Sequence, residues 1–188
     1  MSNFIALYDS CVLYPAPLRD LLMHLALTDL FKAKWTNTIH EEWMRNVKKD
    51  RPDLSIDQLS RTKKLMNEHV RDCLVTGYEK IIESLSLPDP NDRHVLAAAI
   101  RSNAAVIVTY NLKDFPSEAM LEFGIEPQHP DDFISYLFDL SVEKVCNAVR
   151  NQRLSLKNPP LDLEDYLYNL EILNLKKTVK KLREFNDL

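Results

Sequence analysis

The sequence predicts an α/β fold, in which a parallel sheet is flanked by helices and is followed by an all-helical C-terminal extension. Two observations favour this class. Short apolar runs of strand length alternate with amphipathic helical segments, and no strand-like run follows residues 129–138. We therefore place the sheet domain at residues 1–140 and the helical extension at residues 141–188, with a hinge at residues 158–160.

The first half of the chain contains two predicted strands and three predicted helices. "FIALY" (4–8) is apolar and has the length of a strand, and "LRDLLMHLALTDLF" (18–31) has helical periodicity after two prolines. "AKWT" (33–36) predicts a second short strand, followed by a helix from about Thr38 to Lys49. A long amphipathic helix is then expected within residues 55–74.

The second half completes the alternation. "YEKIIESLSL" (78–87) is expected to contain a strand, with a helix as the alternative, and "HVLAAAIRSN" (94–103) predicts a helix. "AAVIVTY" (104–110) is rich in β-branched residues and is the clearest strand of the chain. The extension is expected to consist of helices over residues 142–152, 161–172 and 175–185.

Composition and charge exclude several classes of protein. With 188 residues, 45% hydrophobic and 28% charged, the chain is typical of a globular protein. It shows no secretory leader and no uncharged run that could span a membrane, so we expect a cytoplasmic protein without membrane association. The net charge of −4 argues against non-specific binding of nucleic acid, because such binding to phosphates relies on an excess of Lys and Arg.

Glycine and cysteine usage exclude further kinds of site. Gly77 and Gly124 are the two glycines of the chain, too few for a phosphate-cradling loop or a dinucleotide fingerprint. Three widely spaced cysteines suggest neither a disulfide framework nor a structural zinc site, and they are expected to be reduced and mostly buried: Cys11, Cys73 and Cys146.

Acidic side chains are predicted to gather at the carboxyl edge of the sheet, where ligands bind in open parallel sheets. Asp9 follows the first strand, and Asp92 opens the helix that leads into the strand at 104–110. Taken alone, Asp9 could be a turn residue and Asp92 a helix cap. Acids that converge from distant segments, however, repel one another unless a cation lies among them, and Mg²⁺ or Mn²⁺ prefers such oxygen ligands.

Four segments resemble the motifs of the PIN-domain nucleases, a family that includes the VapC-type toxins of bacterial toxin–antitoxin pairs. The resemblance covers roughly residues 4–138. "IALYDSCVLYPAPLRDLL" is similar to the first motif and "TNTIHEEW" to the second, whose spacing selects Glu42 over Glu41. "DPNDRHVLAAAI" resembles the third motif and "VIVTYNLKDFP" the fourth. Each segment alone is weak evidence, but four in order are specific.

The resemblance implies a set of catalytic residues, and the likeness is imperfect at one of them. A metal held by Asp9, Asp92 and Glu42 is implied, with Asn111 completing the catalytic set. The family commonly has an aspartate at the position of Asn111, so this site loses one charge unless a nearby acid compensates. Supporting roles are expected for Ser10, Asp89, Asp114 and Arg45, whereas His94 is expected on the helix surface.

The resemblance also implies RNA as the substrate and a cognate antitoxin as a partner, with a homodimer left open. Two alternatives remain: a catalytically weak or silent PIN module, and an RNA-processing nuclease without an antitoxin. A haloacid-dehalogenase-type phosphatase is disfavoured because Cys11 occupies the place of its second aspartate. The leucine stripe of the tail, recurring through residues 163–182, either packs on the chain's own core or borders a groove for an antitoxin segment.

Overall fold

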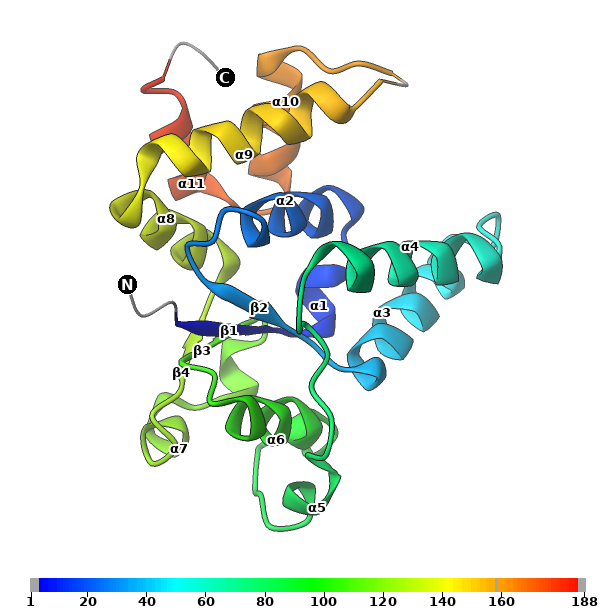
Figure 1. Ribbon diagram of the computed structural model, residues 1–188, viewed down its shortest axis with the longest axis vertical. Coiled ribbons are helices and arrows are strands. Elements are labelled where there is room, and N and C mark those ends of the chain that lie inside the picture. The colour runs from blue at the N-terminus through cyan, green and yellow to red at the C-terminus, as the bar shows by residue number, and fades with distance from the viewer. Residues whose placement is uncertain (1–3, 158, 186–188) are drawn as a thin grey trace.

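A four-stranded, fully parallel sheet forms the centre of the protein (Figure 1). The computed structural model describes residues 4–157 and 159–185. The strand order is β2-β1-β3-β4, and the strands are β1 (Ile5–Tyr8), β2 (Lys32–Lys34), β3 (Val106–Val108) and β4 (Glu126–Gln128). β2 pairs with one side of β1, and β3 pairs with its other side. The strand order therefore reverses between β1 and β3, and their carboxyl ends flank this point.

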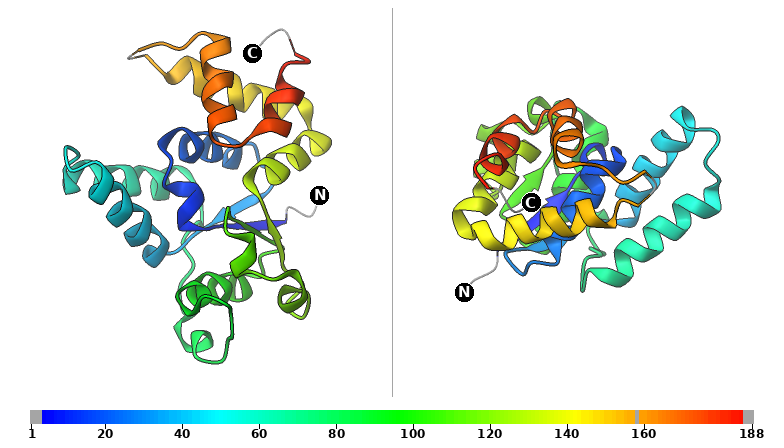
Figure 2. Two further views of the ribbon diagram at one scale, coloured as in Figure 1. Left: turned by 180° about the vertical axis from the view of Figure 1, so that it is seen from behind. Right: turned by 90° about the horizontal axis from the view of Figure 1, so that it is seen from above.

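Helices cover both faces of the sheet. One face carries α2 (Ala16–Ala26) and α8 (Pro130–Leu140), and the other carries α6 (Arg93–Ser102) and α7 (Ser117–Leu121), as Figures 1 and 2 show. The remaining elements before the extension are α1 (Ser10–Leu13), α3 (Asn37–Asp50), α4 (Ile56–His69), α5 (Glu79–Ile82) and the 3₁₀ turns η1 (Pro90–Asp92) and η2 (Leu112–Asp114). The predicted sheet flanked by helices is confirmed.

The hairpin of α3 and α4 extends away from the sheet (Figure 2). Thr36 caps α3 by accepting the N–H of Ile39, and Ser55 begins α4 with a reciprocal capping box. The fully buried His40 of α3 joins the two helices, because its Nε2 donates to Asn67 Oδ1 of α4 at 3.0 Å. Its Nδ1 accepts the indole N–H of Trp43, one turn further along α3, at 3.0 Å. These contacts fix the direction of α3, which carries Glu42.

The C-terminal extension packs on the same core as the sheet. It consists of α9 (Val142–Ser155), α10 (Leu163–Ile172) and α11 (Lys176–Leu182). Most of its leucine stripe is buried in the same hydrophobic core as the sheet, and Leu163 and Leu173 are partly buried against that core. α9 lies along α2, and α11 lies along α8 (Figure 1). Asn158, the first residue of the expected hinge, lies outside the described residues, and the boundary between the two regions stays a prediction.

Buried polar contacts reinforce this packing. The Asp131 carboxylate accepts the main-chain N–H groups of Lys177 and Thr178 at the start of α11. Tyr110, the second residue after β3, donates its hydroxyl to the carbonyl of Leu173, at 2.8 Å. The tail is therefore tied to the end of a central strand. Among the helices of residues 4–157 and 159–185, none combines the length and apolar character that a membrane crossing requires.

Two elements differ from the sequence-based expectations. The expected strand within residues 78–87 is wrong, and its helical alternative is confirmed: a single turn, α5, lets Ile81 and Ile82 pack towards α6. The edge strand β4 was not predicted, because "EPQ" is short and polar and contains Pro127. Proline is tolerated there because an edge strand pairs on one side.

Candidate active site

The strand register brings the ends of three sequence-distant segments together. β1 pairs with β3 so that Tyr8 lies opposite Val108, and the next residues along the two strands are Asp9 and Thr109. On the other side, β1 pairs with β2, after which Thr36 caps α3. One edge of the sheet thus collects the residues that follow β1, β2 and β3.

Asp9 is almost completely buried, 2% exposed, and three donors surround its carboxylate. Its Oδ1 accepts the main-chain N–H of Ser10 at 2.6 Å, and its Oδ2 accepts the Thr109 hydroxyl at 2.7 Å and the Cys11 thiol at 2.9 Å. Burial and the neighbouring Asp9 charge raise the pKa of Cys11, so the thiol stays protonated and acts as a donor. These three donors fix the orientation of the carboxylate.

Asp92 stands at the junction of η1 and α6, and its carboxylate makes no capping hydrogen bond. Asp89 caps the turn instead, by accepting the N–H of Asn91 at 2.8 Å. Burial raises the pKa of Asp92 to about 7, and four negative charges add to the effect: Asp9, Asp89, Asp114 and Glu42. The acids predicted to converge therefore influence one another electrostatically, and the cap alternative for Asp92 is wrong.

Glu42 is held by a residue of another motif. Its Oε1 lies 2.8 Å from His94 Nε2, and the two side chains are 21% and 10% exposed. The expectation that His94 lies on the helix surface is wrong. The second position of α6 faces α3 rather than solvent, so the ring is buried beside Glu42.

The fourth motif contributes one acid to this electrostatic group, from within η2. Asn111 is exposed, and its main-chain N–H donates to Thr109 Oγ1 at 2.9 Å. Asp114, three residues later, is half-buried and acts on Asp92. Arg45 is exposed on α3, one turn after Glu42. The roles expected for these three side chains, and for the Ser10 hydroxyl, stay predictions.

The donor chemistry of this cluster fits a hard divalent cation. Carboxylate oxygens are the preferred ligands of Mg²⁺ and Mn²⁺, and a cation among these acids would offset the repulsion that raises the Asp92 pKa. Within residues 4–157 and 159–185, no three Asp, Glu, His or Cys side chains already form a metal-binding group. Mg²⁺ usually retains several waters and needs only one or two carboxylates, so the arrangement suits an ion bound partly through water.

Three residues of the site were missed in the sequence. Thr109 and Cys11 both contact Asp9 Oδ2, and their sulfur and oxygen atoms lie 3.3 Å apart. His94 contacts Glu42. Thr109 and Cys11 each lie within two residues of a predicted site residue, which is the signal that could have indicated them.

Comparison with known proteins agrees with this arrangement. Residues 6–113 match the family model described as "PIN domain", and residues 130–184 match "VapC50 C-terminal domain". A curated protein of Mycobacterium tuberculosis (strain ATCC 25618 / H37Rv), "Putative ribonuclease VapC50", is 48% identical over 84 residues, which make up 45% of this chain and 49% of that protein. The match thus spans about half the length of this relative. The comparison with solved structures gave no match.

Proposed function

The chain belongs to the PIN-domain family, and on that premise we propose that it is a Mg²⁺- or Mn²⁺-dependent ribonuclease and the toxin of a type II toxin–antitoxin pair. The observation that supports the activity is the electrostatic convergence of acids from all four motifs on Asp92. The name of the 48%-identical relative supports RNA as the substrate. Cleavage of cellular RNA would take place in the cytoplasm.

The residues at the sheet edge can support phosphodiester hydrolysis. Asp9, Asp92 and Glu42 would hold the ion, which when bound lowers the pKa of a water and neutralises charge on the phosphate. Thr109, Cys11 and the Ser10 N–H orient the Asp9 carboxylate before any ligand arrives. Such preorganisation keeps the carboxylate from reorienting during the reaction.

Metal-dependent cleavage of RNA by the purified chain tests this proposal. We expect cleavage with Mn²⁺ or Mg²⁺, none with excess EDTA, and none in Asp9→Asn. Glu83→Gln is the matched control, because Glu83 is an exposed acid that is not among the charges acting on Asp92. Cleavage that persists in EDTA, or that Asp9→Asn retains in full, would refute the proposal.

A catalytically weak or silent interaction module is the second candidate function, and one observation favours it. Asn111 stands where the family commonly has an acid, and it is exposed. The charge of Asp114, which reaches Asp92, supports activity despite this loss. Metal binding without any cleavage of RNA would favour the silent module.

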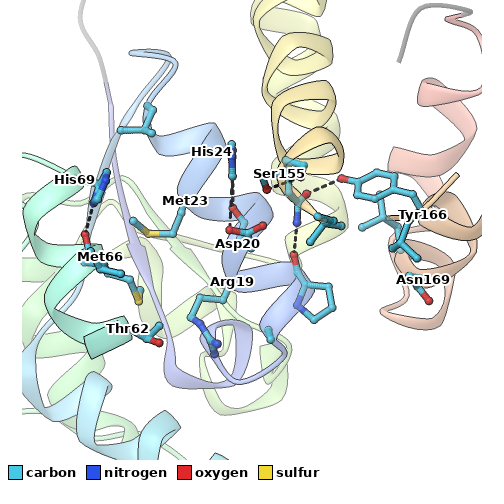
Figure 3. A pocket seen from close by; sticks show the side chains of 18 residues that line it. Arg19, Asp20, Met23, His24, Thr62, Met66, His69, Ser155, Tyr166 and Asn169 are labelled. Carbon is cyan, nitrogen blue, oxygen red and sulfur yellow. Dashed lines mark hydrogen bonds and ion pairs between the residues drawn. The ribbon is translucent and has the colours of Figure 1, made fainter. Parts of the chain in front are cut away.

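A cavity beside the tail supports a partner of the antitoxin kind. It has a volume of about 730 Å³ and lies between α2, α4, the end of α9 and α10 (Figure 3). Its lining is largely apolar, with Met23 from α2, Leu65 and Met66 from α4, and Leu170 from α10. An amphipathic segment could place its apolar face here. None of the five acids of the site lines this cavity.

Co-expression with the product of an adjoining small gene tests the antitoxin proposal. Leu65 is 43% exposed at the cavity, whereas Ile56, on the same helix, is 65% exposed outside it. We expect Leu65→Asp to lose the partner while RNA cleavage persists, and Ile56→Asp to keep both. Equal binding by the two variants would contradict this site, and the absence of such a gene would favour an RNA-processing nuclease.

A further inference from the structure

His94 makes a contact that crosses between two motifs. It is the second residue of α6, and its Nε2 lies 2.8 Å from Oε1 of Glu42, which α3 carries 52 residues earlier. An ionised carboxylate can only accept, so Nε2 carries the proton in this contact. The hydrogen bond therefore has a defined direction, from His94 to Glu42.

The other nitrogen of the ring is unsatisfied. Nδ1 of His94 is buried and has no hydrogen-bond partner among the described residues, although the residue is only 8% exposed. Buried polar groups kept for stability are normally paired. The fully buried His40, by contrast, uses both ring nitrogens. His94 satisfies only the nitrogen that faces Glu42, which favours a role directed at that carboxylate.

The contact restricts what Glu42 can do. With Oε1 engaged by His94, Oε2 is the oxygen that the described residues leave for a cation or water, and the long side chain is held in one arrangement. A free glutamate would lose its rotamer freedom when it bound a ligand, whereas a held one has already lost it. Hydrogen bonds to metal-binding carboxylates tune them in the same manner.

We propose that His94 is a positioning residue, which fixes Glu42 so that its free oxygen faces the acid cluster. This role rests on the proposed function, because it presumes that the cluster binds a divalent cation. It assigns no proton transfer to the imidazole and requires no contact between His94 and the RNA.

Mn²⁺ binding to the full chain provides a test separate from catalysis. Free Mn²⁺ would be counted by electron paramagnetic resonance for wild type, His94→Leu, His94→Ala and His94→Gln, with circular dichroism to confirm folding. We expect the His94→Leu and His94→Ala variants to bind Mn²⁺ more weakly and to cleave RNA more slowly, each by roughly 10- to 100-fold. The glutamine of His94→Gln can still donate an N–H to Glu42, so this variant should retain most of the wild-type Mn²⁺ binding and cleavage rate.

A double-mutant cycle identifies the partner. In the Glu42→Gln background, His94→Leu should have little further effect on Mn²⁺ binding, because the acceptor charge is already absent. Three results would each overturn the positioning role. They are wild-type Mn²⁺ affinity in a folded His94→Leu or His94→Ala variant, Mn²⁺ binding by His94→Gln that is as weak as that of His94→Leu, and additive effects in the cycle. Failure of wild type itself to bind Mn²⁺ and cleave RNA would instead overturn the proposed function, and this role with it.

Discussion

Asp92→Asn is expected to make the metal-free protein more stable while abolishing cleavage. The ordinary aspartate pKa of 3.8 is raised in the fold to about 7. At about 1.4 kcal/mol for each factor of ten in proton affinity, ionising this carboxyl in the folded chain costs about 4 kcal/mol. Asp92 is only half-buried, so solvent screening reduces the expected cost to about 2 kcal/mol.

The direction of the pH dependence follows from the raised pKa. Below pH about 4 the carboxyl is protonated in both the folded and the unfolded chain, and the penalty is absent. As pH rises from about 4 to 7, the unfolded chain releases this proton while burial and four neighbouring charges make the folded chain retain it, so stability falls across this range and is constant above it. Asparagine avoids that step, so its advantage should be largest at pH 8.5 and should shrink to well under 1 kcal/mol at pH 3.5, below both pKa values.

Urea unfolding in EDTA measures this difference directly. We expect Asp92→Asn to exceed wild type by about 2 kcal/mol at pH 8.5, and the control Glu83→Gln to match wild type. Added Mn²⁺ should then raise the stability of wild type more than that of the variant, because only the intact cluster binds the ion strongly. An Asp92→Asn protein no more stable than wild type at pH 8.5, or equally favoured at both pH values, would refute the electrostatic reasoning.

Three further predictions concern the fourth motif, the α3–α4 hairpin and the tail. Asn111→Asp should tighten Mn²⁺ binding and speed cleavage, whereas Asp114→Asn should have little effect; loss of activity in Asp114→Asn would show that this acid has taken over the ligand position. Burial lowers the pKa of His40 to about 4, so the neutral ring fits the fold without penalty above pH 6.5. As pH falls from 6.5 to 4, the free energy of unfolding should decrease by about 3 kcal/mol, because the unfolded chain takes up a proton that the folded chain does not. An unchanged pH dependence of urea unfolding in His40→Phe would contradict this. Tyr110→Phe removes the hydrogen bond to Leu173 and should cost about 1 kcal/mol in urea unfolding, and no loss would show that the bond does not stabilise the tail.

The sequence predicted the elements that depend on local pattern. The β-branched run at β3 and the amphipathic pattern of α4 identify their elements without reference to the rest of the chain. The acids were also predictable, because residues that follow parallel strands share one edge of the sheet. Two elements were not predicted correctly. The strand expected within residues 78–87 is the helical turn α5, and the three residues of β4 form a strand only because the edge of β3 is available to pair with them.

The donors around the acids could not be predicted, because each depends on a contact between distant segments. Cys11 has the sequence context of an ordinary core residue. Its thiol nevertheless forms hydrogen bonds with Asp9 and Thr109, because the register of β1 and β3 places these two residues side by side. His94 had an equally plain position near the start of a helix, and its partner Glu42 is fixed by the direction of α3. The acids that act on Asp92 can thus be predicted from the four motifs, whereas the side chains that contact them follow from strand register and helix direction. Substitutions at Thr109, Cys11 and His94 should therefore separate the orientation of the acids from their charge, because each leaves every carboxylate of the cluster in place.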